Sequence, residues 1–350
     1  MDHPLAETRA VVARAHSNIA LIKYWGKRDA ALNIPAVGSI SLTLDALSTE
    51  TSVAFQSGLA EDEFWLDGAR ADSTRVSRLL HLVRERAGIS ERAVVSSTND
   101  FPTGAGLASS ASGFAALAVA ASAAALSAAL SAAPSAAPSR RGGTIQTMPD
   151  ARELSILARR GSGSAARSLF GGVVELHRGS GADGLDSFAE PLLAPSEWPL
   201  TVVVAITDPE SKLVNSTAGM GESSLSSPFY PSWVATSEGD LSGARTAIAA
   251  RDFERLGELA EYSCLKLHAI MLSTRPALLY WNGATVAAMH AVRELRGSGI
   301  PAYFTIDAGP QLKALCLPTH AQAVADALAE VRGVQQIRIS ALGDGARLVS

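Results

Sequence analysis

Two short segments carry cations and hydroxyls at a spacing that suits anion binding. In the first, residues 17–28 (SNIALIKYWGKR), Lys23, Lys27 and Arg28 surround an aromatic pair. A lysine beside aromatic rings is partly desolvated, and its compact ammonium then pairs well with phosphate. The same residues could form an ordinary solvated turn after a strand, so the segment by itself leaves both interpretations open.

Residues 161–167 (GSGSAAR) are the second of these segments. Ser162, Ser164 and Arg167 converge if this glycine-rich loop folds into a helical turn. The planar fork of an arginine fits a carboxylate or a phosphate through two parallel hydrogen bonds. A helix-capping loop with a surface arginine has the same composition, and from this segment alone it is the simpler interpretation.

A further candidate is Asp307 in FTIDAGP, where the apolar stretch Ala302–Ile306 ends in a Gly-Pro turn. Catalytic residues are often found in the loop that follows a buried strand. Aspartate before glycine and proline is also common turn chemistry, and spacing alone slightly favours that alternative.

The window Pro102–Ala118 (PTGAGLASSASGFAALA) joins three glycines and three serines to an alanine-rich helical pattern. Backbone N–H groups and hydroxyls at a helix N-terminus attract phosphate. The motif GxxxxGK[ST] does not occur in the sequence, so this window is not a Walker loop. A glycine-rich turn into a buried helix explains the window equally well.

Composition narrows the class of protein. The 350 residues exceed one typical domain and indicate two. A net charge of −4 without long basic runs argues against nucleic-acid binding. Cys264 and Cys316 cannot form a disulfide framework, and the first residues contain no apolar signal-peptide core, which together predict a cytoplasmic protein. The uncharged stretch between Asp100 and Arg140 is long enough for a membrane span, but its alanine content predicts a central buried helix over 114–130 instead.

Periodicity predicts strands paired with long helices in both halves, without a regular βαβ repeat, and therefore an α+β fold. Helices are expected at Ser73–Arg86, with Ser73 as the N-cap, at 151–160 and at His320–Val331. Two more are expected at about 243–272 and 276–296, separated by the helix-breaking Pro276. Strands are expected at Val11–Ala13, Ile19–Ile22, Ser39–Asp45, Thr51–Phe55, Phe64–Leu66, Ala93–Ser97, Val202–Ile206, Ala302–Ile306 and Val334–Ser340.

Other catalytic patterns have little support. No GxSxG motif is present, which argues against a serine hydrolase. Cys264 and His268 lie four residues apart on an expected helix and could share a metal. Because no further cysteine or histidine is near them in the sequence, a core cysteine and a surface histidine are the better interpretation.

Five motifs occur in a characteristic order: ARAHSNIALIKYWGKRD, NDFPTGAGLASSASG, RRGSGSAARSLFGG, NSTAGM and DAGP. Together they closely resemble the diphosphomevalonate decarboxylases of the GHMP kinase superfamily, over almost the whole chain. The resemblance implies two α+β domains, an N-terminal nucleotide-loop domain and a ferredoxin-like C-terminal domain, with a cleft between them. We expect the domains at residues 1–198 and 199–350, with a low-complexity Ala/Ser/Pro insertion at about 127–147 that has no counterpart in the family pattern.

The resemblance also implies the reaction: mevalonate 5-diphosphate and ATP, with Mg²⁺, would give isopentenyl diphosphate, ADP, phosphate and carbon dioxide. A homodimer is implied in the same way. The expected site residues fall into three groups. The catalytic set is Asp307, Arg167, Asn18 and Lys27; substrate would contact Tyr24, Lys27, Ser162, Ser164, Arg167, Ser216, Thr217 and Met220; the ATP loop would use Gly104, Gly106, Leu107, Ala108, Ser109, Ser110 and Ser112.

Within these groups, the resemblance gives each cluster one task. Tyr24 and Lys27 would hold the diphosphate, and Arg167 would hold the carboxylate that later leaves. Asp307 would accept the proton of the 3-hydroxyl, or orient that hydroxyl, during phosphoryl transfer. No magnesium ligand can be assigned.

Two positions depart from the family pattern. Thr217 stands where some bacterial members have arginine, and Gln311 stands where many have asparagine after DAGP. Both departures affect how strongly the site would select a diphosphate substrate. A decarboxylase of the monophosphate, a kinase that stops after phosphorylating the 3-hydroxyl, and a nucleotide-binding protein without activity are the alternatives.

Overall fold

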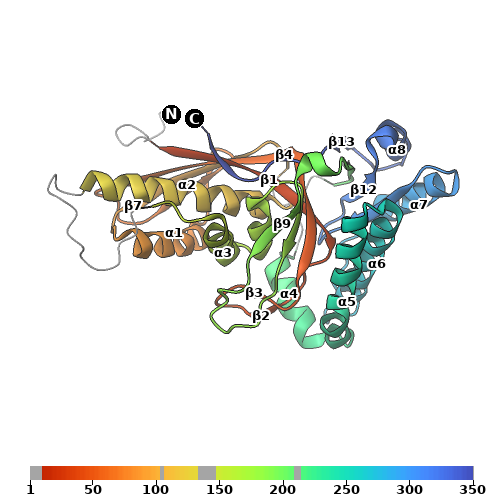
Figure 1. Ribbon diagram of the computed structural model, residues 1–350, viewed down its shortest axis with the longest axis horizontal. Helices are drawn as coiled ribbons and strands as arrows, with labels where there is room; N and C mark the ends of the chain where they lie inside the picture. The colour runs from red at the N-terminus through yellow and green to blue at the C-terminus, as the bar shows by residue number, and fades with distance from the viewer. Residues whose placement is uncertain (1–9, 103–105, 133–146, 209–213, 350) are drawn as a thin grey trace.

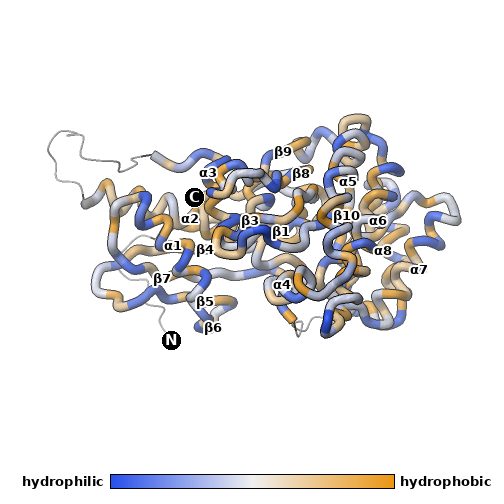
Figure 2. Tube along the Cα trace, turned by 90° about the horizontal axis from the view of Figure 1, so that it is seen from below, coloured by the Kyte–Doolittle hydropathy of each residue, from blue (hydrophilic) through white to orange (hydrophobic). Residues whose placement is uncertain are grey.

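The structure, a computed structural model, describes residues 10–102, 106–132, 147–208 and 214–349. The N-terminal and C-terminal elements lie side by side along the long axis of the molecule (Figures 1 and 2). Each half contains its own sheet with helices packed on it. The predicted α+β fold with two halves is therefore confirmed.

The first sheet is built around two long strands, β1 (Val11–Ile22) and β4 (Ser39–Gln56). Its eight strands run in the order β14-β1-β4-β7-β5-β6, and β8 extends it from β4 to β9. All pairs are antiparallel except β5 with β7. The other bounds are β5 Glu63–Leu66, β6 Ala69–Arg70, β7 Arg92–Asn99, β8 Val173–Leu176, β9 Ala189–Leu193 and β14 Arg347–Val349; a separate hairpin joins β2 (Lys27–Asp29) to β3 (Ile34–Pro35).

Three helices cover one face of this sheet: α1 (Thr74–Ala87), α2 (Ser109–Ala132) and α3 (Ala151–Gly161). The alanine-rich α2 is long and apolar enough to cross a membrane, yet 61% of its most apolar window is buried inside the fold, against β1 and β4. Small side chains let the helix approach the strands closely, so the predicted central helix is a core element. The structure places its first turn at Ser109, five residues before the expected start.

The second sheet has the order β11-β12-β10-β13 and is antiparallel throughout. Its strands are β10 (Thr201–Ile206), β11 (Ala302–Ile306), β12 (Leu312–Cys316) and β13 (Gln336–Ser340). The helices of this half are α4 Ser216–Ser226, α5 Tyr230–Ala250, α6 Phe253–Leu272, α7 Gly283–Gly297 and α8 Ala321–Ala329. Hydrophobic residues from both sheets, such as Ile40 and Val202, join one buried cluster that ties the halves together.

Several predicted boundaries are wrong, each for a local reason. The helix expected over 243–272 is two helices, because Arg251 takes a left-handed φ of 56° and Asp252 then caps α6 by accepting from the N–H of Arg255. The helix expected from 276 begins only at Gly283, capped by Asn282. By contrast, the N-cap predicted at Ser73 is confirmed, since α1 begins at Thr74, although the Ser73 side chain makes no capping hydrogen bond among the described residues.

Short strands were missed by the periodicity argument. β8, β9, β12 and β14 span three to five residues each, too few to show an alternating pattern. β14 lies at the end of the chain, yet Val349 pairs with Val12 of β1. The last strand therefore extends the N-terminal sheet.

The division of the chain into domains at residue 198 stays a prediction. Residues 133–146 of the expected insertion lie outside the described residues.

Candidate active site

A cavity of about 840 Å³ lies between the two halves, and residues from both line it. The N-terminal half contributes the ends of β1 and α3, the first residues of α2 and one side of α1. The C-terminal half contributes the start of α4 and the turn after β11. A polar cleft of this size, walled by two sheets, is the natural place for a small-molecule site.

Asp307 stands at the floor of the cavity, directly after β11. Its carboxylate Oδ1 accepts a hydrogen bond from Lys23 Nζ at 2.7 Å, and the Lys23 side chain is 1% exposed while that of Asp307 is 27% exposed. Burial opposes ionisation of this carboxyl, but Lys23, Lys313 and Arg167 outweigh it and hold the pKa of Asp307 below its usual value. Asp307 is thus an ionised carboxylate that the protein holds through Oδ1 and that is still exposed enough to contact a ligand in the cavity.

Arg167 comes from the 3₁₀ turn Gly163–Leu169, which is separated from α3 by the single extended residue Ser162. Its guanidinium donates from Nε and Nη2 to Asn18 Oδ1 at 3.1 and 2.9 Å, and from Nη1 to Ser39 Oγ at 2.6 Å. The Asn18 amide is fixed in turn by donating to Ser168 Oγ at 2.8 Å. Three donors are used and two remain, because a guanidinium has five N–H groups.

Among the residues that the structure describes, no carboxylate lies within hydrogen-bonding distance of the Arg167 guanidinium. The residue is only 2% exposed, and burial lowers the pKa of Arg167 to about 10, against the opposing effect of Asp307 and Tyr24. It stays protonated at neutral pH. A rigid, buried guanidinium that lines a cavity and is held by neutral acceptors is arranged to bind an anion.

The YWGKR segment is held in place by α5. Gly26 has a φ of 95°, and a Cβ there would lie 2.0 Å from the Tyr230 hydroxyl, so only glycine fits. The Trp25 carbonyl accepts a hydrogen bond from Trp233 Nε1 at 3.1 Å. This packing turns Tyr24 and Lys27 toward the cavity that they line.

Two properties make these side chains suitable for an anion. The Tyr24 hydroxyl is buried and makes no hydrogen bond to the described part of the chain, and burial raises the pKa of Tyr24 to about 12, so it remains a neutral donor. Burial and the neighbouring Arg75 lower the pKa of Lys27. An unsatisfied buried donor beside cations is costly without a ligand, which points to a binding function.

The start of α2 forms the part of the cavity lining that lies next to the turn after Asp307. Gly106 and Ala108 take left-handed φ values of 82° and 60° before the helix begins at Ser109. Gly106, Ala108, Ser109 and Ser110 line the cavity, and Ser110 Oγ lies within hydrogen-bonding distance of Ser162 Oγ, at 3.3 Å. The helix dipole of α2 therefore opens onto the cleft.

Not every residue expected in the nucleotide loop faces the cavity. Leu107 packs in the hydrophobic core. Ser112 is fully buried, and its hydroxyl lies 2.6 Å from Thr49 Oγ1 and 3.2 Å from Ser17 Oγ. Gly104 lies outside the described residues. The loop approaches a ligand mainly through Gly106 and the serines at the first turn of α2.

Fourteen expected residues meet at one cavity. They lie in five separate parts of the chain: Asn18, Tyr24, Lys27, Gly106, Ala108, Ser109, Ser110, Ser162, Ser164, Arg167, Ser216, Thr217, Met220 and Asp307. The α4 residues are placed by an N-cap, in which Asn215 Oδ1 accepts from the Ala218 N–H at 2.9 Å. The cavity thus joins a carboxylate, a buried guanidinium and a helix N-terminus.

Comparison with known proteins agrees with this geometry. Residues 15–189 match the family profile of the diphosphomevalonate decarboxylase-like N-terminal domain, and residues 202–343 match the mevalonate 5-diphosphate decarboxylase C-terminal domain. The diphosphomevalonate decarboxylase of Homo sapiens is 35% identical over 333 residues, covering 88% of this chain and 76% of the human protein. The chain belongs to the diphosphomevalonate decarboxylase family.

Solved structures give the same result. The mevalonate diphosphate decarboxylase of Staphylococcus aureus superimposes with a TM-score of 0.86 at 38% identity, covering 99% of this chain and 100% of that one. MDDEF in complex with MVAPP, AMPPCP and magnesium reaches 0.85 at 38% identity, covering 98% and 99%. The predicted function, decarboxylation of mevalonate diphosphate in the mevalonate pathway, is confirmed at this level, and the chain is a soluble enzyme of this family.

Sequence reasoning missed several cationic residues of this decarboxylase site. Lys23 was recognised as a cation but was not assigned to the reaction centre, because nothing in the spacing links it to Asp307, 284 positions later. Arg75 and Arg78 of α1 and Arg160 of α3 also line the cavity. The arginines of α1 carried a signal, since they lie on the first turns of an amphipathic helix whose other face is buried.

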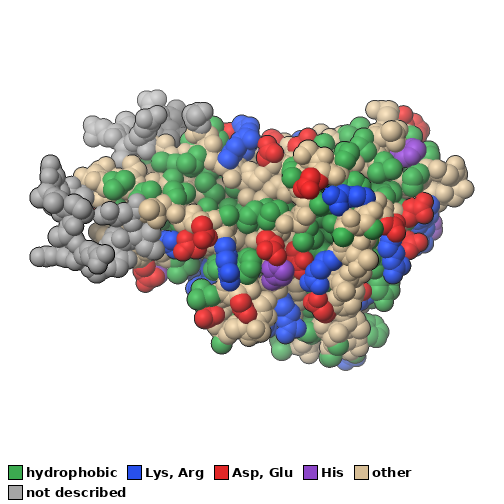
Figure 3. Space-filling view, viewed as in Figure 1, with side chains coloured by type: hydrophobic (Ala, Val, Ile, Leu, Met, Phe, Trp, Pro, Cys, Tyr) green, Lys and Arg blue, Asp and Glu red, His purple; other side chains and the backbone are tan. Residues whose placement is uncertain are grey.

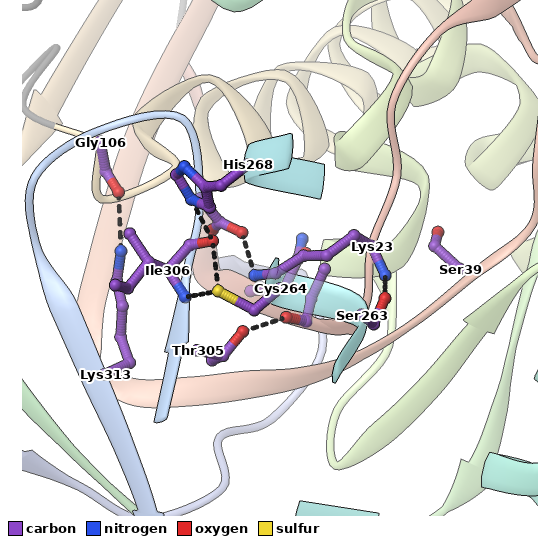
Figure 4. A network of polar contacts seen from close by, with 12 residues as sticks. Lys23, Ser39, Gly106, Ser263, Cys264, His268, Thr305, Ile306 and Lys313 are labelled. Atoms are coloured by element: carbon purple, nitrogen blue, oxygen red, sulfur yellow. Dashed lines mark hydrogen bonds and ion pairs between the residues drawn. The ribbon is translucent and has the colours of Figure 1, made fainter. Parts of the chain in front are cut away.

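A resident metal site is not evident among the described residues, which contain no group of three or more His, Cys, Asp and Glu side chains that could hold an ion. Cys264 and His268 have other partners. Cys264 Sγ accepts a hydrogen bond from the Ile306 N–H at 3.2 Å, and His268 Nε2 lies 3.3 Å from the Ile306 carbonyl oxygen, so both contact the strand that leads to Asp307 (Figure 4). His268 is buried, which contradicts the expected surface position.

Gln311, one of the two departures from the family pattern, does not face the substrate cleft. It is fully buried, and its Oε1 accepts from the Thr207 N–H at 2.6 Å while its Nε2 donates to the Asp208 carbonyl. Its role is to join the end of β10 to the DAGP turn. Thr217, the other departure, does line the cavity.

Proposed function

We propose that this cleft converts mevalonate 5-diphosphate and ATP to isopentenyl diphosphate, ADP, phosphate and carbon dioxide, with the substrate extended between Arg167 and Lys27. The observation that carries the proposal is the buried guanidinium of Arg167, which has two unused donors and faces the same cavity as Asp307. A rigid carboxylate clamp is what the decarboxylation step requires, because the leaving group must stay aligned with the bond that breaks.

Arg167 holds the substrate carboxylate in this proposal. Asn18 and Ser39 fix the plane of the guanidinium, so its remaining N–H groups have one orientation. The leaving carboxylate must stay aligned with the bond that breaks, and a preorganised partner supplies that alignment without further ordering. Asn18 is therefore a positioning residue, and Ser162 and Ser164 supply hydroxyls beside it.

Asp307 faces the 3-hydroxyl. Because its pKa is held low, the carboxylate is ionised and can accept the hydroxyl hydrogen bond at neutral pH. A carboxylate with a low pKa is a weak base, so orientation of the hydroxyl is its main task until phosphoryl transfer makes the proton acidic. Lys23 fixes the carboxylate through its 2.7 Å hydrogen bond.

Once phosphorylated, the tertiary alcohol becomes a good leaving group. Loss of phosphate builds positive charge at C3, and electrons from the carboxylate C–C bond then form the double bond as carbon dioxide departs. The nearby carboxylate of Asp307 stabilises that charge electrostatically in a cleft that excludes bulk water.

The diphosphate end lies with Tyr24 and Lys27. The unpartnered Tyr24 hydroxyl supplies a donor, and the lysine supplies charge. Ser216 and Thr217 add hydroxyls at the N-terminus of α4, whose dipole favours an anion, and Met220 closes the apolar side.

ATP occupies the α2 side, with its phosphates toward Gly106, Ala108, Ser109 and Ser110. Mg²⁺ keeps several waters and usually binds proteins through few side chains together with substrate phosphates. That preference agrees with a site that offers the hydroxyl oxygens of Ser109 and Ser110 but has no carboxylate cluster among the described residues. When bound, the ion neutralises charge on the transferring phosphate.

The test is an assay of the purified enzyme with ATP and, in turn, mevalonate, its 5-phosphate and its 5-diphosphate. ADP and carbon dioxide are measured separately. We expect equal amounts of both with the diphosphate and little of either with the other two compounds. ADP without carbon dioxide would overturn the decarboxylase, and equal rates with the monophosphate would overturn the selection of a diphosphate.

The family resemblance also supports a homodimer in the cytoplasm, with the domain division near residue 198. Both cysteines are free thiols, which suits a reducing compartment. The described face in Figure 3 mixes charges of both signs, without a large basic patch that would suggest nucleic acid. Light scattering on the purified enzyme tests the dimer, since a mass near 36.2 kDa would contradict it.

A further inference from the structure

A second buried lysine lies beside the reaction centre and has no place in the chemistry above. Lys313 is on β12 and is only 2% exposed. Its ammonium Nζ donates to the Gly106 carbonyl oxygen at 2.9 Å, across 207 positions of sequence (Figure 4). An ammonium is expensive to bury unless charge or strong hydrogen bonds compensate it. The chain places it at the junction of the nucleotide loop and the catalytic turn.

The acceptor of this hydrogen bond lies two residues before a strained position. Gly106 has a left-handed φ that glycine adopts freely, but Ala108 also has one, and a non-glycine residue in that conformation persists only when its surroundings hold it. A Cβ on Gly106 would lie 2.9 Å from Gly309 Cα, so the loop end rests directly on the turn that follows Asp307. Ser17 Oγ adds a weaker contact of 3.4 Å to the Ala108 carbonyl.

The ammonium also acts on Asp307. Lys23, which directly follows β1, contacts the carboxylate, whereas Lys313 lies on β12 opposite Thr305 of β11; Lys313 and Arg167 both act on the carboxylate electrostatically. The remaining titratable neighbours are on α6 and are neutral near pH 7, since burial raises the pKa of Cys264 to about 11 and lowers the pKa of His268 to about 3. Positive charge around the carboxylate therefore comes from these three cations.

We propose that Lys313 is a positioning residue that couples the two halves of the reaction: it fixes the Gly106 end of the nucleotide loop against the Asp307 turn and adds positive charge beside that carboxylate. The inference rests on the proposed function, in which ATP phosphates lie at this loop. Its consequence is that one side chain affects both the binding of ATP and the protonation of Asp307.

Two substitutions separate these effects. Lys313→Met removes the donor and the charge; Lys313→Gln removes the charge but keeps an N–H donor within reach of Gly106. We expect Lys313→Met to raise KM for ATP about tenfold, because the Gly106 end of the nucleotide loop loses its charged anchor and must be ordered by the ligand, with KM for mevalonate 5-diphosphate unchanged. Both variants should move the acid limb of the kcat–pH profile to higher pH, because a lost cation makes the carboxylate easier to protonate.

Lys266→Met is the matched control. It removes an ammonium of α6 that pairs with Asp240 at 2.6 Å outside the cleft. This variant should keep the wild-type KM for ATP and the wild-type acid limb. Melting curves for all variants show whether each one folds.

An unshifted acid limb in folded Lys313→Gln, or a wild-type KM for ATP in folded Lys313→Met, would overturn the inference. If Lys313→Met does not fold, the glutamine variant alone decides. Failure of the proposed function would give a different experimental result from failure of this inference. In that case the wild-type enzyme itself would fail to release carbon dioxide with ADP, whereas active wild type with unaffected variants would refute only the role of Lys313.

Discussion

Replacing Arg167 by glutamine tests the central feature of the site. Three of the five guanidinium donors are bound to Asn18 and Ser39, so two remain for the substrate carboxylate. A hydrogen bond to a charged group contributes about 1.5–3 kcal/mol, and two contribute about 3–6 kcal/mol. At 1.36 kcal/mol per factor of ten, we expect kcat/KM for mevalonate 5-diphosphate to fall by about 10²–10⁴.

The fold should survive this change. Glutamine can still donate to Asn18 or Ser39. The substitution also removes a buried charge to which no anion is directly bonded, and this relieves a desolvation cost. We therefore expect the melting temperature to stay within a few degrees of wild type. The affinity for ATP should be nearly unchanged, because the nucleotide loop is on another wall of the cavity.

The assay is steady-state kinetics with each substrate varied in turn, combined with calorimetric titration of an ATP analogue. Arg28→Gln is the matched control, since Arg28 is exposed and donates to the Gly181 carbonyl at 2.8 Å away from the cavity lining. A kcat/KM within tenfold of wild type would refute the carboxylate clamp. A large loss of nucleotide affinity would instead place Arg167 on the ATP.

Three further outcomes follow from the same geometry. Asp307→Asn should lower kcat by at least about 10²-fold while ATP and substrate still bind; near wild-type turnover would remove Asp307 from the mechanism. Tyr24→Phe should raise KM for the diphosphate substrate about tenfold with kcat little changed, since one hydrogen bond is lost, and an unchanged KM would show that the hydroxyl has no ligand. His268 is buried with a pKa of about 3, below its unfolded value near 6.5, so its contribution to stability is complete above pH 6.5 and declines as the pH falls. Denaturant unfolding should show a loss of about 2 kcal/mol from this group between pH 6.5 and 5, absent in His268→Gln; equal pH dependence in both proteins would contradict the assignment.

The sequence determined most of the side chains that line the cavity. The left-handed φ at Gly26 is a local requirement, and the glycine and serine pairs around 161–164 form a recognisable motif, so both can be identified without a fold. The order of the five motifs along the chain then indicated the family. Long elements were also predictable, because β4 and α2 carry their patterns over many residues.

Tertiary structure decided which of those side chains act together. The pair Lys23–Asp307 and the bond from Lys313 to Gly106 each join residues more than 200 positions apart, and no local pattern encodes that distance. It also decided that Ser112 and Gln311 face the interior although they belong to the same motifs as cavity residues. The physical reason is that residue type and spacing fix local conformation, whereas the electrostatics of the site depend on which strand ends meet when the two sheets pack.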